Sequence, residues 1–294
     1  MADVDRRRLT CGLALLAAGV TAARAQPAGA AALKVDQVAA GLFRLDGGGA
    51  TALMRFTPAG TLLLGCKRAS HQRPLLTTLQ RLGRTADLAV KLAVLPSHLP
   101  EHAGNAAALA AAGVPLVAHE RTLARLPDLQ RGGAGRMAPR SYRDQLDVSL
   151  GERPMQLHHL GPAVTDNDSV LLFADLRLLA LGDLYTAQPP LPDWVGGGSL
   201  GGWIRALDAA LGLPWDRALG AAGPLVDRTA VQALRQRLQA ARQRARDLGQ
   251  QGLDPQAVAA DLVQSGSLGQ GLMDYNTAGA LRGELAREQL ITRD

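Results

Sequence analysis

Cysteine and aromatic residues are scarce in this sequence of 294 residues, and lysine is nearly absent. There are two cysteines, and Trp, Tyr and Phe occur three times each. Because only Cys66 follows the N-terminal region, the rest of the chain can form neither an intramolecular disulfide nor a Cys₄ zinc cluster. So few aromatic rings offer little surface for base stacking, and we expect no nucleic-acid binding despite a net charge of +6.

The first 25 residues have the pattern of an export signal. Arginines at 6–8 precede an apolar stretch at 11–23, and the Ala-Arg-Ala sequence at 23–25 matches a small-x-small cleavage site. The apolar stretch is shorter than the roughly 20 residues that a helix needs to span a bilayer. We therefore expect cleavage near Ala25, no stable membrane anchor, and a periplasmic or secreted product. The arginine cluster resembles a twin-arginine signal, and an arginine-rich general secretory signal is the alternative.

The mature chain is expected to form a single domain over residues 26–294 with mixed α/β structure. Apolar runs of strand length alternate with segments of helical spacing in both halves, which is typical of a layered α/β domain. Strands are predicted at 35–45, 51–56, 61–64, 88–95, 115–118, 155–160, 169–174 and 178–181. Helices are predicted at 74–82, 105–112, 200–211, 228–248, 255–265 and 275–289.

The segment 95–105 has the densest set of chemically capable side chains. It follows a predicted buried strand, which is where α/β folds place their sites. His98, Glu101 and His102 match the H-x-x-E-H zinc-peptidase pattern, which requires one continuous helix. Pro100 lies inside this pattern, and proline within a helix costs about 3 kcal/mol. The sequence therefore argues against that class of peptidase.

The order of five motifs resembles the metallo-β-lactamase superfamily over nearly the whole mature chain. Segment 97–105 resembles the family's first metal loop, and Leu181-Gly182-Asp183 resembles the Gly-Asp motif with its bridging aspartate. The other three matching segments are 160–168, 196–207 and 221–224. This resemblance implies an α/β fold of one four-layer αββα sandwich.

The resemblance also identifies which zinc ligands have been replaced. Four histidine positions of the family hold other residues, namely Ser97, Leu99, Val164 and Ala222. The residual metal ligands would be Glu101, His102 and Asp183, with Glu101 in place of an aspartate. Gly65 replaces a further aspartate that the family usually keeps. The resemblance therefore implies either no cofactor or one weakly bound zinc ion.

Three functional hypotheses follow. The first is an exported relative that has lost most zinc ligands and acts as a non-catalytic or weakly active binding or accessory protein. Its partner would be a small molecule or a periplasmic protein. The second is a hydrolase with a single metal at Glu101, His102 and Asp183 that cleaves an ester, thioester or amide. The third is a partner protein that acts through the arginine-rich helix at 228–248.

Several single residues have two interpretations. Cys66 is expected to be either packed and inert or a reactive thiol whose pKa is lowered by Lys67 and Arg68. The arginines of 228–248 are expected to form the solvated face of an amphipathic helix rather than an anion-binding patch. His71 and His119 stand at expected helix starts, and we expect both at the surface.

Overall fold

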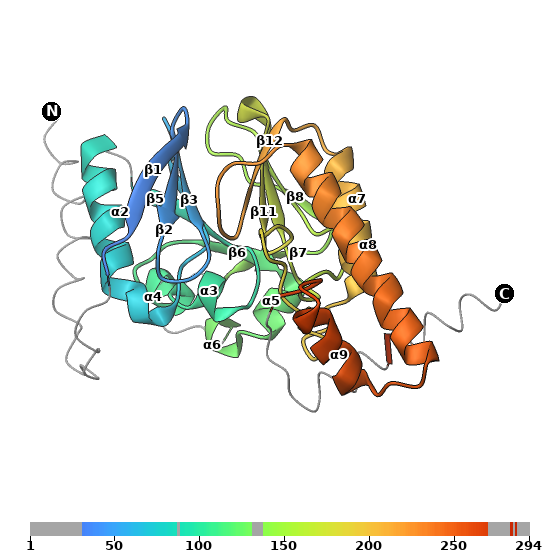
Figure 1. The fold of residues 1–294 in the computed structure, drawn as a ribbon. Coiled ribbons are helices and arrows are strands. Elements are labelled where there is room, and N and C mark those ends of the chain that lie inside the picture. Colours follow the sequence, from blue (N-terminus) through green and yellow to red (C-terminus); the bar gives the residue numbers. More distant parts are fainter. Residues whose placement is uncertain (1–30, 87–88, 131–137, 270–282, 285, 287–294) are drawn as a thin grey trace, which may run out of the picture.

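Two β-sheets pack face to face, and helices cover the outer face of each sheet (Figure 1). The structure is a computed structural model that describes residues 31–86, 89–130 and 138–269, together with Gly283, Glu284 and Ala286. The first sheet has the strand order β1 (Lys34–Ala39), β2 (Leu42–Asp46), β3 (Ala52–Thr57), β4 (Gly60–Leu64), β5 (Val90–Leu95), β6 (Leu116–His119) and β7 (Arg140–Tyr142). The second has the order β12 (Arg217–Gly220), β11 (Leu178–Gly182), β10 (Val170–Phe173), β9 (Met155–His158) and β8 (Gln145–Asp147).

The helices form the two outer layers. Beside the first sheet lie α2 (Gln72–Ala86), α3 (Pro100–Ala103), α4 (Ala106–Ala111), α5 (Glu120–Ala124) and α6 (Pro127–Gln130). Beside the second sheet lie α7 (Leu200–Gly212), α8 (Arg228–Gln250) and α9 (Pro255–Gln264). Two short 3₁₀ turns, Ala69–His71 and Ala174–Leu176, complete the described elements.

Alternation along the central strands explains why four layers form. In β4, Leu62 and Leu64 face the second sheet, whereas Leu63 packs beneath α2 and α4. In β11, Leu178 belongs to the core between the sheets, and Leu179 belongs to the core under α7 and α8. A strand with apolar side chains on both faces must be covered on both. The predicted αββα sandwich is therefore confirmed.

The strand predictions were incomplete in two respects. The segment predicted as one strand at 35–45 is two antiparallel strands, because the chain reverses at Gly41, whose φ of 64° favours glycine. Strands β7 and β8 were not predicted, because three residues are too few to produce a periodic pattern, and the four-residue strand β12 was not predicted either. Of the helix predicted at 275–289, only Gly283, Glu284 and Ala286 are described, and they are helical.

The segment 1–25, which the sequence predicts to be an export signal, lies outside the described residues. Within the part of the chain that the structure describes, no helix combines the length and the apolar character needed to cross a membrane.

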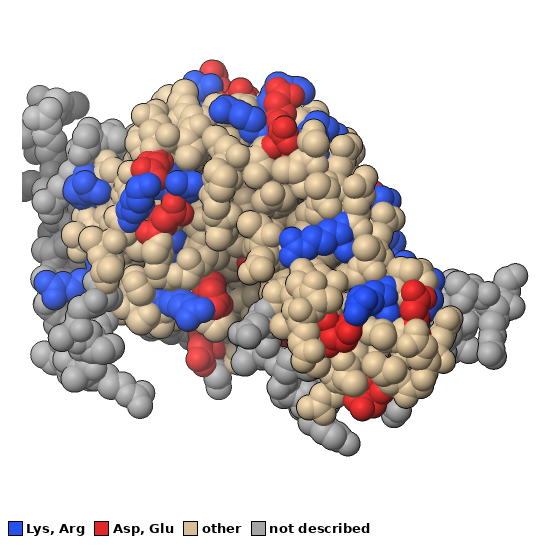
Figure 2. All heavy atoms as spheres, in the orientation of Figure 1, with Lys and Arg blue, Asp and Glu red and all other residues tan. Residues whose placement is uncertain are grey.

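The arginines of α8 bind neighbouring elements. Arg235 pairs with Asp208 of α7, and Arg244 pairs with Asp261 of α9. Arg237 donates to the carbonyls of Ala187, Ser267 and Gly266. Acidic and basic side chains accordingly lie next to one another on the face shown in Figure 2. The arginines therefore lie on the polar face of an amphipathic helix whose buried side includes Val231, Leu234 and Leu238, as predicted, and they also link α8 to neighbouring elements.

Candidate functional site

The loops after β5 and β11 meet at one end of the sandwich. Ser97 and His102 follow β5, and Asp183 follows β11 in the other sheet. Asp183 Oδ2 lies 2.9 Å from Nε2 of His102 and 3.5 Å from Oγ of Ser97. His102 and Ser97 are buried, and Asp183 is mostly buried. The fold thus joins three predicted site residues that are up to 86 positions apart in the sequence.

His102 and Asp183 form an ion pair at the centre of this site. Burial acts to lower the pKa of His102, but the surrounding acidic side chains, Asp183 foremost, raise it above its ordinary value. The contact is short, although neither ring nitrogen has a hydrogen bond of good geometry. Attraction between opposite charges, more than directional bonding, therefore holds this pair together.

A second buried carboxyl lies close to the pair. Asp168 accepts hydrogen bonds from the backbone N–H of Thr165 at 2.7 Å and from its hydroxyl at 2.8 Å. Burial, together with the charge of Asp183, raises the pKa of Asp168 to about 7. Two carboxyl groups share one buried region here, and such proximity disfavours their simultaneous ionisation.

Gly65 explains why one nitrogen of His102 has no partner. A Cβ placed on Gly65 would lie 3.7 Å from Nδ1 of His102. The resemblance places an aspartate at this position, where its carboxylate would be close to that nitrogen. In this chain Nδ1 is buried without a hydrogen bond, and orientation of a metal-binding imidazole depends on such a bond.

Glu101 does not join the pair. It lies on the short helix α3, and its carboxylate forms an ion pair with Arg68. His98 lies before this helix, so the segment is not the continuous helix that the zinc-peptidase pattern requires. Among the residues described here, no group of three or more His, Cys, Asp or Glu side chains could hold a metal ion.

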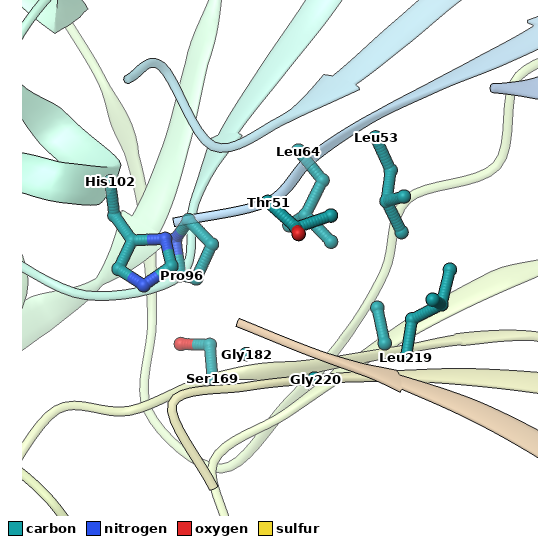
Figure 3. Close-up of a pocket in the computed structure, with 10 residues that line it drawn as sticks. Thr51, Leu53, Leu64, Pro96, His102, Ser169, Gly182, Leu219 and Gly220 are labelled. Atoms are coloured by element: carbon teal, nitrogen blue, oxygen red, sulfur yellow. The ribbon is translucent and has the colours of Figure 1, made fainter. Parts of the chain in front are cut away.

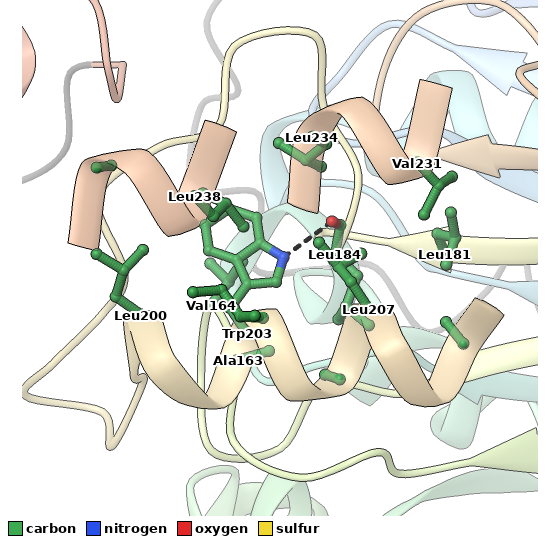
Figure 4. Close-up of a cluster of buried hydrophobic side chains, with 14 of the residues drawn as sticks. Ala163, Val164, Leu181, Leu184, Leu200, Trp203, Leu207, Val231, Leu234 and Leu238 are labelled. Carbon is green, nitrogen blue, oxygen red and sulfur yellow. Dashed lines mark hydrogen bonds between the residues drawn. The ribbon is translucent and has the colours of Figure 1, made fainter. Parts of the chain in front are cut away.

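The other replaced positions differ in how close they come to the pair. Leu99 is adjacent through its backbone N–H, which lies 3.4 Å from Oγ of Ser97. Ala222 is exposed, but its neighbour Ala221 donates to the carbonyl of Gly182 at 2.8 Å. Val164 belongs to the apolar core with Leu181, Leu184 and Trp203 (Figure 4). The backbone loops converge, while the Val164 side chain is part of the core.

A polar network beside the site was not predicted. Asn167 is fully buried and contacts the backbone N–H of His98 at 3.0 Å and the hydroxyl of Thr122 at 3.0 Å. Its neighbour Asp166 pairs with Arg125, which also donates to the carbonyl of Gly196. The only sequence signal was the Thr-Asp-Asn-Asp run at 165–168, since these side chains commonly bond nearby backbone.

The cysteine and histidine expectations can also be compared with the structure. Cys66 is fully buried in the core under α2, and burial raises its pKa to about 12, so the thiol is packed and the expected lowering of its pKa is not found. Nζ of Lys67 donates to the carbonyls of Leu45 and Ala50 at 2.6 Å each. His119 was expected at the surface and is 1% exposed, because it caps α5 and its ring packs 4.1 Å from that of His159.

The cavity at the site is small (Figure 3). It measures about 10 Å³, close to the space of one water molecule. His102, Pro96 and Ser169 lie on its lining, together with residues of both sheets. This cavity is too small to hold a substrate group larger than a water molecule.

Zinc, the metal of the resembling family, does not fit the residues present. Zinc sites in proteins usually have three or four protein ligands. Here the described donors in direct contact are one imidazole and one carboxylate, His102 and Asp183, and the remaining nitrogen of the imidazole lacks an orienting partner. The nearby carboxyl group of Asp168 is bonded to Thr165 instead. Glu101, the third expected ligand, is neutralised by Arg68.

Comparison with known proteins gives matches among solved structures only. No protein-family model matches the sequence, and no curated protein does. A metallo-β-lactamase from Pontibacter korlensis superposes with a TM-score of 0.60 at 16% identity, covering 70% of this chain and 99% of that one. The FIM-1 metallo-β-lactamase from Pseudomonas aeruginosa, in its mono-zinc form, superposes with a TM-score of 0.60 at 14% identity, covering 72% of this chain and 96% of that one. The DIM-1 metallo-β-lactamase superposes with a TM-score of 0.61 at 12% identity, covering 72% of this chain and 99% of that one. The agreement in three dimensions, at so low an identity, establishes that this protein has the metallo-β-lactamase fold.

Proposed function

We propose that this protein is an exported binding or accessory protein that has kept the metallo-β-lactamase fold and given up zinc hydrolysis. The observation that carries the proposal is that each residual ligand is engaged by another side chain of the protein. His102 contacts Asp183, and Glu101 contacts Arg68. A hydrolytic zinc site needs ligands whose lone pairs are directed at the metal and an open position for water.

The packing around the replaced ligands supports the same function. An empty cluster of buried imidazoles would leave polar groups without partners, each at a cost of about 1–3 kcal/mol. Leu99 and Val164 avoid this cost, and Val164 contributes to the core under α7. The sequence pattern at 1–25 supports export, so the ligand or protein partner would be met outside the cytoplasm.

Metal analysis of the purified protein tests this proposal. Protein produced with zinc in the medium and dialysed without chelator should contain well below one zinc ion per chain. An Asp183→Asn variant, prepared in parallel, should contain the same trace amount, because the natural site offers too few ligands to hold the ion. The measurement is elemental analysis against protein concentration.

The competing single-metal hydrolase makes the opposite prediction. One zinc ion per chain that disappears in the Asp183→Asn variant would refute the proposed function. Chelator-sensitive hydrolysis of a β-lactam, ester or thioester by the natural protein would refute it as well.

A further inference from the structure

Glu284 places a buried carboxylate at the N-terminus of α7. This residue is 6% exposed and accepts four hydrogen bonds. Trp194 Nε1 donates at 2.5 Å and Ser199 Oγ at 2.7 Å. The backbone N–H groups of Gly201 and Leu200 donate at 2.9 and 3.3 Å. The donors lie 83 to 90 positions before Glu284 in the sequence.

The donors form a site whose chemistry suits a carboxylate. The first N–H groups of a helix have no partner within the helix, and the helix dipole favours a negative charge there. Trp194 and Ser199 add two side-chain donors, and the buried indole N–H of Trp194 requires an acceptor. Ser199 also accepts from the N–H of Gly202 at 2.9 Å, which fixes the direction of its hydroxyl. A burial this complete would be costly for a carboxylate that lacked such donors.

The loop that carries Trp194 and Ser199 is hydrogen-bonded to the 163–168 loop, which borders the candidate functional site. The N–H of Ser199 donates to the carbonyl of Ala163 at 2.8 Å, and the N–H of Asp193 donates to that of Val164 at 2.7 Å. A Cβ on Gly198 would lie 2.3 Å from the same Val164 oxygen, so the two loops meet backbone to backbone. The 163–168 loop in turn holds Asn167 and Asp168 beside the site.

We propose that Trp194, Ser199 and the N-terminus of α7 form a carboxylate-binding site whose built-in ligand is Glu284. The site accepts a small free carboxylate when that side chain is removed. When Glu284 occupies the site, the 193–199 loop is held against the 163–168 loop. Glu284 is therefore a positioning residue for the 163–168 loop, which borders the candidate functional site. This inference is independent of the proposed function.

A Glu284→Ala variant of the full chain tests the proposal by chemical rescue. The substitution removes one methylene and the carboxylate, a space that acetate matches in size. In potassium chloride, hydrogen exchange at residues 193–201 should be at least about tenfold faster than in the natural protein, because this loop opens locally. Exchange in 163–168 should also rise, while α8 at 228–248 stays unchanged. Potassium acetate at equal ionic strength should restore most of the protection in the variant and leave the natural protein unaffected.

Two further variants make the outcome decisive. Glu284→Gln keeps one acceptor oxygen and should show partial protection, which also provides the measurement if the alanine variant does not fold. Glu152→Ala removes an exposed carboxylate and should change neither segment. Unchanged exchange at 193–201 in Glu284→Ala would overturn the positioning role. Faster exchange with no difference between acetate and chloride would overturn the carboxylate-binding site.

Discussion

Replacing Asp183 with Asn should lower the free energy of unfolding by about 2 kcal/mol at pH 6. Breaking a buried ion pair typically costs 3–5 kcal/mol, and the partial exposure of Asp183 reduces this figure. Asn keeps the shape of Asp and removes the charge that stabilises protonated His102. For a chain of this size the loss corresponds to a fall in melting temperature of about 4–8 °C, measurable by calorimetry.

The same variant has a pH dependence whose sign follows from His102. The pKa of His102 is raised in the folded protein, so the pair's contribution is fully present below the unfolded value of about 6.5. It is lost as the pH rises through the higher folded value, when His102 becomes neutral in both proteins. The difference between natural protein and variant should therefore shrink between pH 6 and pH 9.

A matched control exists on the same side of the molecule. Asp193 lies 3.8 Å from Nε2 of His98, and both side chains are more exposed than the central pair. Asp193→Asn should change the unfolding free energy by less than about 0.5 kcal/mol, because exposed pairs contribute little. An equal loss in both variants, or a loss at Asp183 that grows with pH, would contradict the assigned pair.

Restoring the four missing histidines should raise zinc affinity by at least about a hundredfold. The variant combines Ser97→His, Leu99→His, Val164→His and Ala222→His, so that imidazoles join His102 and Asp183. Calorimetric titration with zinc against the natural protein measures the change. The structure adds one expectation, namely a stability cost at Val164, because this position lies in the apolar core and a polar ring there costs about 1–3 kcal/mol.

A triple variant that retains Val164 separates folding from binding. It avoids the substitution in the apolar core and should be more stable than the quadruple variant, although the imidazole at the buried position 97 still has a cost. It should also bind zinc more tightly, because Ser97 already lies within 3.5 Å of Asp183. If the folded triple and quadruple variants both bind no more zinc than the natural protein, the replaced positions do not surround one site.

The four-layer fold was predictable because its signals are spread along the chain. The apolar runs at 61–64, 88–95 and 178–181 mark strands covered on both faces, and Val231, Leu234 and Leu238 mark the apolar side of α8. Turns that depend on one glycine, such as the reversal at Gly41, left no periodic signal. Short edge strands such as β7 and β8 were missed for the same reason.

The candidate site was predictable only in part. The retained motifs identified His102 and Asp183, and their contact follows from the order of the sheets. The pairing of Glu101 with Arg68 depends on how two loops approach each other, which residue types and spacing cannot determine. Asn167, Asp168 and Glu284 were missed because burial, and not residue type, gives these side chains their importance.

The contact made by Glu284 also sets an order of events during synthesis. Translation produces Trp194 and Ser199 before Glu284, which follows them by 90 and 85 positions, so the N-terminus of α7 is synthesised well before the carboxylate that it binds. Until Glu284 is in place, the donors at the N-terminus of α7 are hydrogen-bonded to water, and the 193–199 and 163–168 loops lack the contribution of this contact. Formation of this contact therefore follows synthesis of the core strands, and a variant truncated shortly before Glu284 would retain those strands and lack the contact.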